Sequence, residues 1–321
     1  MDDASLFVLN KINEHLDKPD TCIRLMFFDF SSAFSTIQPH LSAKKLHSMN
    51  VTYTSISWIL DYLTDRPKFV KLDDCCSEVL YTNTGAPQGT VLSPFLFTLY
   101  TADCKSTSDS CPLVKFADDS ALTGLITHDA DINYRHEIER FVAWCDENFL
   151  ELNVKTNKIN ELVIDFRKSK SDLDKVVIKN ETVEQVETYK YLGVIIDKKL
   201  SWTENSNAML RKVNSRMYCL RKLKSFHVCN KLLQMFYSSV ICSVLTYGTV
   251  CWGGNLTKHD KNRLEKMIRK AGGVVGETQS TFENMHKKKM MDRLKAILND
   301  ETHPLYPDFS DRQIERSGRF R

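Results

Sequence analysis

Three aspartates lie at the ends of short apolar runs, where carboxylates could be held close together. Asp29 lies near the end of IRLMFFDF (Ile23–Phe30), and Asp118 and Asp119 follow the run CPLVKFA. Adjacent carboxylates repel each other, and this repulsion disfavours ionisation unless a cation is present. Mg²⁺ suits such a group, because it accepts one or two carboxylates and completes its shell with water and phosphate oxygens. These residue types therefore predict metal-assisted displacement at phosphorus, in which two ions clamp the attacking and leaving oxygens.

The aspartate pair also has a structural interpretation. Asp-Asp pairs are common in turns, where the carboxylates accept backbone hydrogen bonds. The catalytic interpretation requires that Asp29 lie beside the pair, which happens only if the two strands concerned are neighbours in one sheet.

The elements that must position these aspartates are predicted from hydrophobic periodicity and turn residues. Ile23–Phe30 is short and nearly all apolar, as is typical of a strand covered on both faces. Leu113–Ala117 and Ala121–Ile126 are expected to form a hairpin with the two aspartates at its tip. Further strands are expected at 68–72, 79–83, 161–166, 176–178, 182–186 and 191–196, and helices at 4–16, 39–48, 55–63, 93–101 and 131–149. Ser93 is expected to cap the fourth of these helices, with Pro94 in its first turn.

After Trp202 the pattern becomes mostly helical and basic. Leu210, Val213, Met217 and Leu220 have the spacing of one helix face. Between Lys198 and Lys231 there are nine Lys and Arg residues and one acid, Glu204. Such a face is often merely solvated, but it is also what binding to phosphates requires.

Composition and short sequence patterns argue against a zinc-binding, a secreted and a membrane-spanning protein. The chain has 321 residues, 42% hydrophobic and 26% charged, with a net charge of +3, which is ordinary for a globular protein. Its ten cysteines include no C-x-x-C pair, so zinc-binding spacing is missing. The first residues are charged and amphipathic, unlike a secretory signal, and we expect reduced thiols. The uncharged segment Leu232–Thr257 is long enough to span a membrane, but its serines, threonines and glycines favour a buried helix followed by a turn.

Five segments occur in a fixed order: FDFSSAFSTI, GAPQGTVLSP, FADD, LNVKTNK and YKYLGVIID. In order and spacing they closely resemble the reverse transcriptases of non-LTR (LINE-type) retrotransposons, from about Asp2 to at least Gly276. The helical continuation also resembles these elements, particularly those of vertebrates. The resemblance implies an α+β fold with a polymerase-like palm, an antiparallel sheet with helices on one face. It implies partial fingers and palm at 1–199, an all-helical thumb at 200–276, and a C-terminal helix with a loosely ordered tail at 277–321.

The activity that this resemblance implies is RNA-directed DNA synthesis. Its partners would be an RNA template, a DNA primer and dNTPs, with two Mg²⁺ ions for which Mn²⁺ could substitute. By resemblance, Asp29 and Asp118 are the main metal ligands and Asp119 is the second member of the pair. Lys155 would act as a general acid that assists pyrophosphate departure.

The resemblance also assigns residues that contact nucleotide and nucleic acid. Phe34 would lie beneath the sugar of the incoming nucleotide and exclude a 2′-OH, although by itself it reads equally well as a core phenylalanine. The other nucleotide-binding residues would be Phe30, Ala33, Gln88 and Gly89, with the backbone amides of residues 30–33 facing the triphosphate. The template or primer would contact Gly85, Pro87, Tyr191, Leu192, Gly193, Arg211, Lys212 and Arg216.

The resemblance leaves other functions open. The family carries an endonuclease and further polymerase segments upstream of MDDASLF, so we expect an N-terminally truncated piece of a longer element. Such a piece could be a catalytically inactive nucleic-acid-binding remnant. A metal-dependent nuclease could use the same aspartates, but the GAPQG and YKYLG segments favour a polymerase. An iron oxygenase would need two histidines and a carboxylate on one face, and the sequence has no H-x-D. We expect an intracellular protein of the nucleus or cytoplasm, not secreted and without a membrane partner; its oligomeric state stays open.

Overall fold

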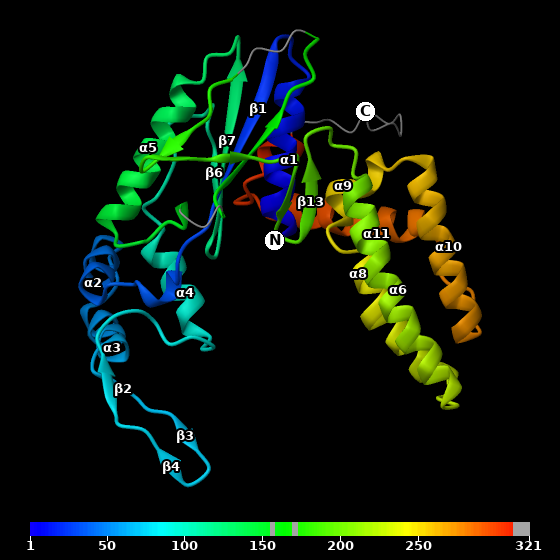
Figure 1. The fold of residues 1–321 in the computed structure, drawn as a ribbon, viewed down its shortest axis with the longest axis horizontal. Helices are drawn as coiled ribbons and strands as arrows, with labels where there is room; N and C mark the ends of the chain where they lie inside the picture. The colour runs from blue at the N-terminus through cyan, green and yellow to red at the C-terminus, as the bar shows by residue number, and fades with distance from the viewer. Residues whose placement is uncertain (155–157, 169–172, 311–321) are drawn as a thin grey trace. The chain divides into compact units, whose positions relative to one another are not determined.

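The computed structural model describes residues 1–154, 158–168 and 173–310. The chain forms two compact units (Figure 1). The first, which we call the sheet unit, is His15–Val186, and the second, the helical unit, combines Met1–Glu14 with Glu187–Arg321. The predicted division into 1–199, 200–276 and 277–321 stays a prediction, because these units are defined by compactness and not by function.

The sheet unit is built on a mainly antiparallel sheet. In the described residues its five strands follow the order β11-β8-β1-β7-β6. They are β1 (Thr21–Phe28), β6 (Leu113–Phe116), β7 (Asp119–Thr127), β8 (Asn160–Ile164) and β11 (Glu184–Gln185). Only β11 runs parallel to its neighbour, β8, among these pairings. All eight residues of the central strand β1 are buried, which confirms the strand predicted from the apolar run.

Helices pack on the sheet through one apolar core. Helix α5 (Ile132–Glu147) lies along the sheet in Figure 1, and the rings of Phe28 and Phe141 are 4.2 Å apart. The same core includes residues of α2 (Pro39–Ser48), α3 (Tyr53–Leu63) and α4 (Leu92–Tyr100). The predicted cap of the last of these helices was wrong. Helix α4 begins at Leu92, and the hydroxyl of Ser93 donates instead to the carbonyl of Pro87.

Short strands complete the sheet unit. After α3 the chain runs out as a ribbon (Figure 1), in which β2 pairs with β5 and β3 with β4. These strands are β2 (Arg66–Lys68), β3 (Lys71–Leu72), β4 (Cys75–Cys76) and β5 (Leu80–Thr82), and a further hairpin pairs β9 (Val177–Ile178) with β10 (Glu181–Thr182).

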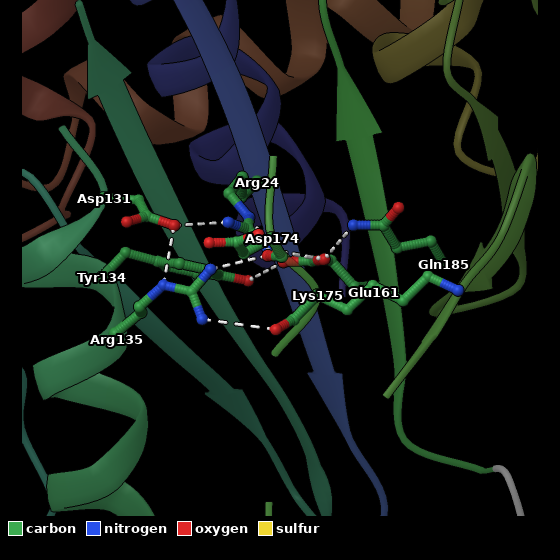
Figure 2. A network of polar contacts seen from close by, with 8 residues as sticks. All are labelled: Arg24, Asp131, Tyr134, Arg135, Glu161, Asp174, Lys175 and Gln185. Atoms are coloured by element: carbon green, nitrogen blue, oxygen red, sulfur yellow. Dashed lines mark hydrogen bonds and ion pairs between the residues drawn. The ribbon is translucent and has the colours of Figure 1, made fainter. Parts of the chain in front are cut away.

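A charged network lies inside the sheet unit, on the strand that was predicted from a nearly all apolar run (Figure 2). Arg24 of β1 and Glu161 of β8 both have fully buried side chains, and they are joined by two hydrogen bonds of 2.8 and 3.0 Å. Arg24 also donates to Asp131 and to the carbonyl of Asp174. Burial opposes the charge on the guanidinium, but the hydrogen bonds and the charge of Glu161 raise the pKa of Arg24 overall.

The carboxylate of Glu161 accepts hydrogen bonds from three residues. Besides Arg24, the donors are the hydroxyl of Tyr134, at 2.9 Å, and the side-chain amide of Gln185, also at 2.9 Å. The ring of Tyr134 lies 5.2 Å from the Arg24 guanidinium, within range of a cation–π contact. Gly124, which pairs with Arg24 across the β1–β7 ladder, makes room for this ring, because a Cβ there would lie 2.6 Å from it. The network therefore connects α5 to three strands.

The second segment of the helical unit, from Glu187 onward, begins with a hairpin and continues as helices. Strands β12 (Thr188–Tyr191) and β13 (Val194–Asp197) replace the single strand predicted at 191–196. The turn between them is Leu192-Gly193, and both residues have positive φ, 45° and 85°, as a two-residue hairpin turn of type I′ requires. The predicted helix face is confirmed, since its four apolar residues are all buried.

The helices of this unit include an irregular stretch. A π-helix, η3 (Tyr237–Cys242), continues α7 (Asn230–Phe236) into α8 (Ser243–Leu245). The others are α6 (Thr203–Ser225), α9 (Thr249–Trp252), α10 (Lys258–Val275), α11 (Phe282–Leu298) and α12 (Tyr306–Ser310), and α10 lies beside α6 (Figure 1). Within the described residues no single helix could cross a membrane by length and composition; Asn230–Leu245 and Thr249–Asn255 pass that test only as a pair bent by 42°.

Helix α1 (Asp2–Leu16) has most of its length in the helical unit. Lys11 forms an ion pair with Asp308 at 3.4 Å. Asp3 pairs with Arg293 and with His303, at 2.5 and 3.1 Å. These contacts attach the first residues of the chain to its last described helices.

Removing one partner of the buried pair should destabilise the protein strongly. We expect Arg24→Met to lower the free energy of unfolding by about 3–5 kcal/mol, because the buried carboxyl of Glu161 would lose its partner. Urea unfolding followed by circular dichroism measures this. Arg135→Ala is the matched control, since that guanidinium bonds the same Asp131 from a partly exposed position, and it should cost less than about 1 kcal/mol. Equal effects of the two variants would contradict the role given to the pair.

Candidate active site

Strand register brings Asp29 to the aspartate pair. Phe28, the last residue of β1, pairs with Ser120 of β7. Asp29 is the next residue after Phe28, and Asp119 the residue before Ser120, so the two aspartates occupy the same end of neighbouring antiparallel strands. The predicted hairpin is confirmed with a shorter tip, because Asp119 already pairs with Phe116 and the turn is Ala117-Asp118. Ala117 takes a positive φ of 53° to close it.

The electrostatics of Asp119 agree with this placement. Its pKa is raised above the usual value for aspartate, first by desolvation and then by the negative charges of Asp118 and Asp29. The carboxylates of Asp118 and Asp29 therefore repel that of Asp119, as the sequence analysis predicted for a cluster of acids that binds a cation.

Two residues hold the first aspartate, and sequence reasoning gave neither this role. The side-chain amide of Asn153 donates to the Asp29 carboxylate, and its backbone N–H donates to the Asp29 carbonyl at 3.0 Å. Lys158 lies 3.7 Å from the same carboxylate, with both side chains partly exposed. Lys155, the predicted general acid, lies outside the described residues.

The side chains at this strand end carry the kind of ligand atom that a hard divalent ion binds. These atoms are carboxylate oxygens, the ligands that Mg²⁺ prefers. Among the described residues, however, no group of three or more His, Cys, Asp or Glu side chains is close enough to hold a metal by itself. The two observations agree, because Mg²⁺ takes one or two carboxylates from a protein and its remaining ligands from water and substrate phosphates.

The predicted nucleotide-binding residues gather on a short segment and a loop. Phe34 lies in the 3-10 helix η1 (Ala33–Ser35), partly buried, with its ring 5.2 Å from that of Phe97. The loop joins this segment through two backbone bonds of 2.7 Å, from Gly85 to the carbonyl of Ile37 and from Ala86 to that of Phe34. The predicted GAPQG loop and the predicted sugar-contacting residue are therefore neighbours.

The predicted nucleotide-binding residues differ in how far they are exposed to solvent. Gln88 and Gly89 are exposed. Phe30 and Ala33 are buried, so only their backbone could reach a ligand, and the amide of Ser31 already donates to the carbonyl of Glu151. Of the backbone amides at 30–33 that were predicted to face the triphosphate, the amide of Ser31 is therefore already used within the protein.

Gly85 and Pro87 have structural partners. Gly85 is buried, and a Cβ on it would lie 2.7 Å from the backbone of Ser35, so glycine permits the close approach of the two segments. The carbonyl of Pro87 accepts hydrogen bonds from Thr90 and Ser93. Their contact with template or primer stays a prediction.

The other residues predicted to contact template or primer lie in the helical unit. Tyr191 and Leu192 are buried, and the carbonyl of Leu192 accepts a hydrogen bond of 2.9 Å from Tyr247. Arg211 and Lys212 are exposed on α6, and Arg216 is partly buried and donates to the carbonyl of Val240. Gly193, Lys212 and Arg216 line the same cavity, so structure brings these three together.

Comparison with known proteins gives two matching family models. Residues 2–196 match the model described as reverse transcriptase (RNA-dependent DNA polymerase). Residues 202–243 match a short model described as the N-terminal region of alkylated DNA repair protein alkB homolog 8. The first match covers more than half of the chain and includes the three aspartates.

Curated relatives come from fruit flies. The chain is 24% identical to a probable RNA-directed DNA polymerase from transposon X-element of Drosophila melanogaster, over 96% of this chain and 36% of that protein. It is 26% identical to the RNA-directed DNA polymerase from mobile element jockey of Drosophila funebris, over 84% of this chain and 31% of that protein. The chain thus spans about a third of the length of these relatives.

Solved structures that match the chain include two telomerases. The telomerase of Candida albicans, in complex with a TWJ fragment of telomeric RNA, is 13% identical with a TM-score of 0.40, over 95% of this chain and 52% of that one. The corresponding complex from Candida tropicalis is 10% identical with a TM-score of 0.45, over 95% of this chain and 51% of that one.

The raised pKa of Asp119 has a consequence for stability. The folded state binds this proton more tightly than the unfolded state, so the charged group costs stability at neutral pH, and that cost disappears as the pH falls through its folded pKa. In metal-free buffer we expect Asp119→Asn to stabilise the protein by up to about 1 kcal/mol at pH 7, a small effect because solvent still reaches the partly desolvated carboxylate and screens its charge.

The measurement is thermal unfolding of wild type and variant across pH. The difference between them should shrink as the pH falls, and added Mg²⁺ should stabilise wild type more than the variant. A difference that grows on acidification would overturn the assignment of like-charge repulsion at this strand end.

Proposed function

The chain belongs to the reverse transcriptase family, and from this premise we propose that it is the RNA-directed DNA polymerase of a non-LTR retrotransposon. One observation carries the proposal. The β1–β7 register sets Asp29 beside Asp119, and the pKa of Asp119 is raised first by desolvation and then by the negative charges of Asp118 and Asp29. Acidic groups placed at the same end of two neighbouring strands are what nucleotidyl transfer requires.

The proposed substrates are an RNA template, a DNA primer and dNTPs. Two Mg²⁺ ions, or Mn²⁺ in their place, would activate the primer 3′-OH and stabilise charge on the transferred phosphate. Asp29, Asp118 and Asp119 would hold these ions. Asn153 supports this role by orienting the Asp29 carboxylate from the neighbouring loop.

The surroundings of the aspartates support a role in placing the nucleotide. The exposed Gln88-Gly89 edge of the loop is attached, through Ala86, to the segment that carries Phe34. A nucleotide beside Phe34 would therefore lie close to this loop. Lys158 adds a positive charge near Asp29, where a triphosphate needs one.

Several finer assignments are part of the same proposal. Lys155 would be the general acid for pyrophosphate. The protein would act inside the cell, in the nucleus or the cytoplasm. The relation to vertebrate elements, and the view that this chain is a truncated piece of one, rest on the sequence resemblance alone, and the relatives from Drosophila neither support nor oppose them.

Primer extension tests the proposed activity. The purified chain is given an RNA template, a labelled DNA primer, dNTPs and Mg²⁺, and products are resolved by length. We expect extension that Asp118→Asn/Asp119→Asn lowers at least about 100-fold, the scale for losing one contact to a developing charge. Absence of extension, with template binding retained at low salt, would identify a catalytically inactive nucleic-acid-binding remnant instead.

Selection of the sugar provides a second test. If Phe34 lies under the incoming sugar, Phe34→Ala should raise the use of rNTPs relative to dNTPs by about 10–100-fold, because steric exclusion of one small group is worth about 1–3 kcal/mol. Single-nucleotide incorporation of dCTP and CTP by the same preparation measures the ratio. Phe34 also packs on Phe97, so the dCTP rate of the variant is the internal control for folding. An unchanged ratio would return Phe34 to the role of a core residue.

A further inference from the structure

The helical unit contains a cavity of about 560 Å³ beside the β12–β13 turn. Its walls come from that hairpin, from α6 and from the end of the irregular helix η3–α8. Pockets that hold small organic ligands typically measure about 300–1,000 Å³. The cavity is therefore large enough for one nucleotide.

The cavity is positively charged. Lys190, Lys212 and Arg216 line it, and the described lining residues include no Asp or Glu. Arg216 is held in place because it donates to the carbonyl of Val240 in the π-helix. A guanidinium has five N–H donors, so this bond leaves others for an anion. A cation fixed before the ligand arrives loses less conformational entropy on binding.

The rest of the cavity has the character of a base-binding surface. Tyr247 is 43% exposed, and its ring is held by the hydrogen bond from its hydroxyl to the carbonyl of Leu192. Met209 adds apolar surface. Asn205 accepts a hydrogen bond from the backbone amide of Ile195 through its side-chain oxygen, and its amide nitrogen carries two donors suited to the edge of a base.

We propose that this cavity binds a single unpaired nucleotide of a nucleic-acid strand. The phosphate contacts Lys212 and Arg216, and the base stacks on Tyr247. Aromatic stacking beside a basic surface is the usual mode of binding single strands without sequence preference. A nucleotide within a duplex could enter only after its base pair opens. The inference rests on the proposed function for the class of ligand, and it adds a preference for unpaired strands to the helical unit.

Equilibrium binding tests the proposal without any chemistry. The probes are a labelled single-stranded RNA of about ten nucleotides, the DNA of the same sequence, and the duplex of each. Fluorescence anisotropy is measured on the full chain in about 100 mM salt, where exposed charges are screened beyond ~10 Å, with no dNTP and no Mg²⁺. The RNA and DNA arms show which strand the site prefers.

The decisive variants are two lysines of one helix. Lys212 lines the cavity, whereas Lys222 is exposed further along α6 and outside it. We expect Lys212→Ala to weaken single-strand binding by about fivefold or more, as loss of a charge-assisted contact should, and duplex binding by less than twofold. Lys222→Ala should change both by less than about twofold, the effect of one diffuse charge. Thermal unfolding of both variants verifies that they fold.

Equal weakening by the two variants, or an equal loss of duplex and single-strand binding, would overturn the proposal in favour of a diffuse phosphate-binding face. Photo-cross-linking of a 5-iodouridine strand adds a positional readout: adducts should map to Tyr247 or Met209, and adducts confined to other surfaces would also overturn it. The two proposals fail separately. Absent primer extension with intact, Lys212-dependent binding refutes only the polymerase activity, and primer extension with equal effects of both lysine variants refutes only the cavity.

Discussion

The sheet unit depends on one charge that is buried at its centre. The side chains of Arg24 and of Glu161 opposite it are fully buried, so their hydrogen bonds must come from the protein and not from water. An incomplete network of this kind costs more than an apolar core would. The Arg24–Glu161 pair joins β8 to β1, and the hydrogen bond from Tyr134 to Glu161 attaches the start of α5 to them. Gly124 of β7 leaves the space that the Tyr134 ring occupies. A strand held in this way keeps its end, and therefore Asp29, in a defined position.

How much of this could be read from the sequence depended on the range of the interactions. The apolar run of β1, the hairpin around the aspartates and the basic helix α6 are local patterns, and their existence was predicted correctly. The network was missed because Arg24 finds its partners at residues 131, 161 and 174, and a single charge in an apolar strand does not reveal them. A charged residue inside a run predicted to be covered on both faces was nevertheless a signal, since such a side chain must be paired.

The boundaries were less predictable than the elements, for physical reasons visible in particular residues. The two-residue turn at Leu192-Gly193 was read as a continuous strand because leucine rarely takes a positive φ, and tertiary contacts of Tyr247 support it there. Ser93 looked like a helix cap but bonds a loop carbonyl.

The site itself combines a rigid interior with a strained edge. The buried network of Arg24 and Glu161 stabilises the sheet, while the charges of Asp29 and Asp118 repel that of Asp119 at the strand ends. Rigid support of a strained group is how proteins keep reactive side chains in place.

The attachment of α1 to the last described helices has a consequence for biosynthesis. A ribosome adds about 5–20 residues per second, and domains generally fold as units while the chain emerges. The sheet unit, His15–Val186, is continuous in sequence and can fold as soon as it leaves the exit tunnel. Met1–Glu14 precedes the sheet unit in the chain, yet the partners of Asp3 and Lys11 lie at residues 293–308. This amphipathic segment must therefore wait for roughly ten seconds or more before the partners of Asp3 and Lys11 are made, a period in which a chaperone that recognises such helices would have its best opportunity to bind.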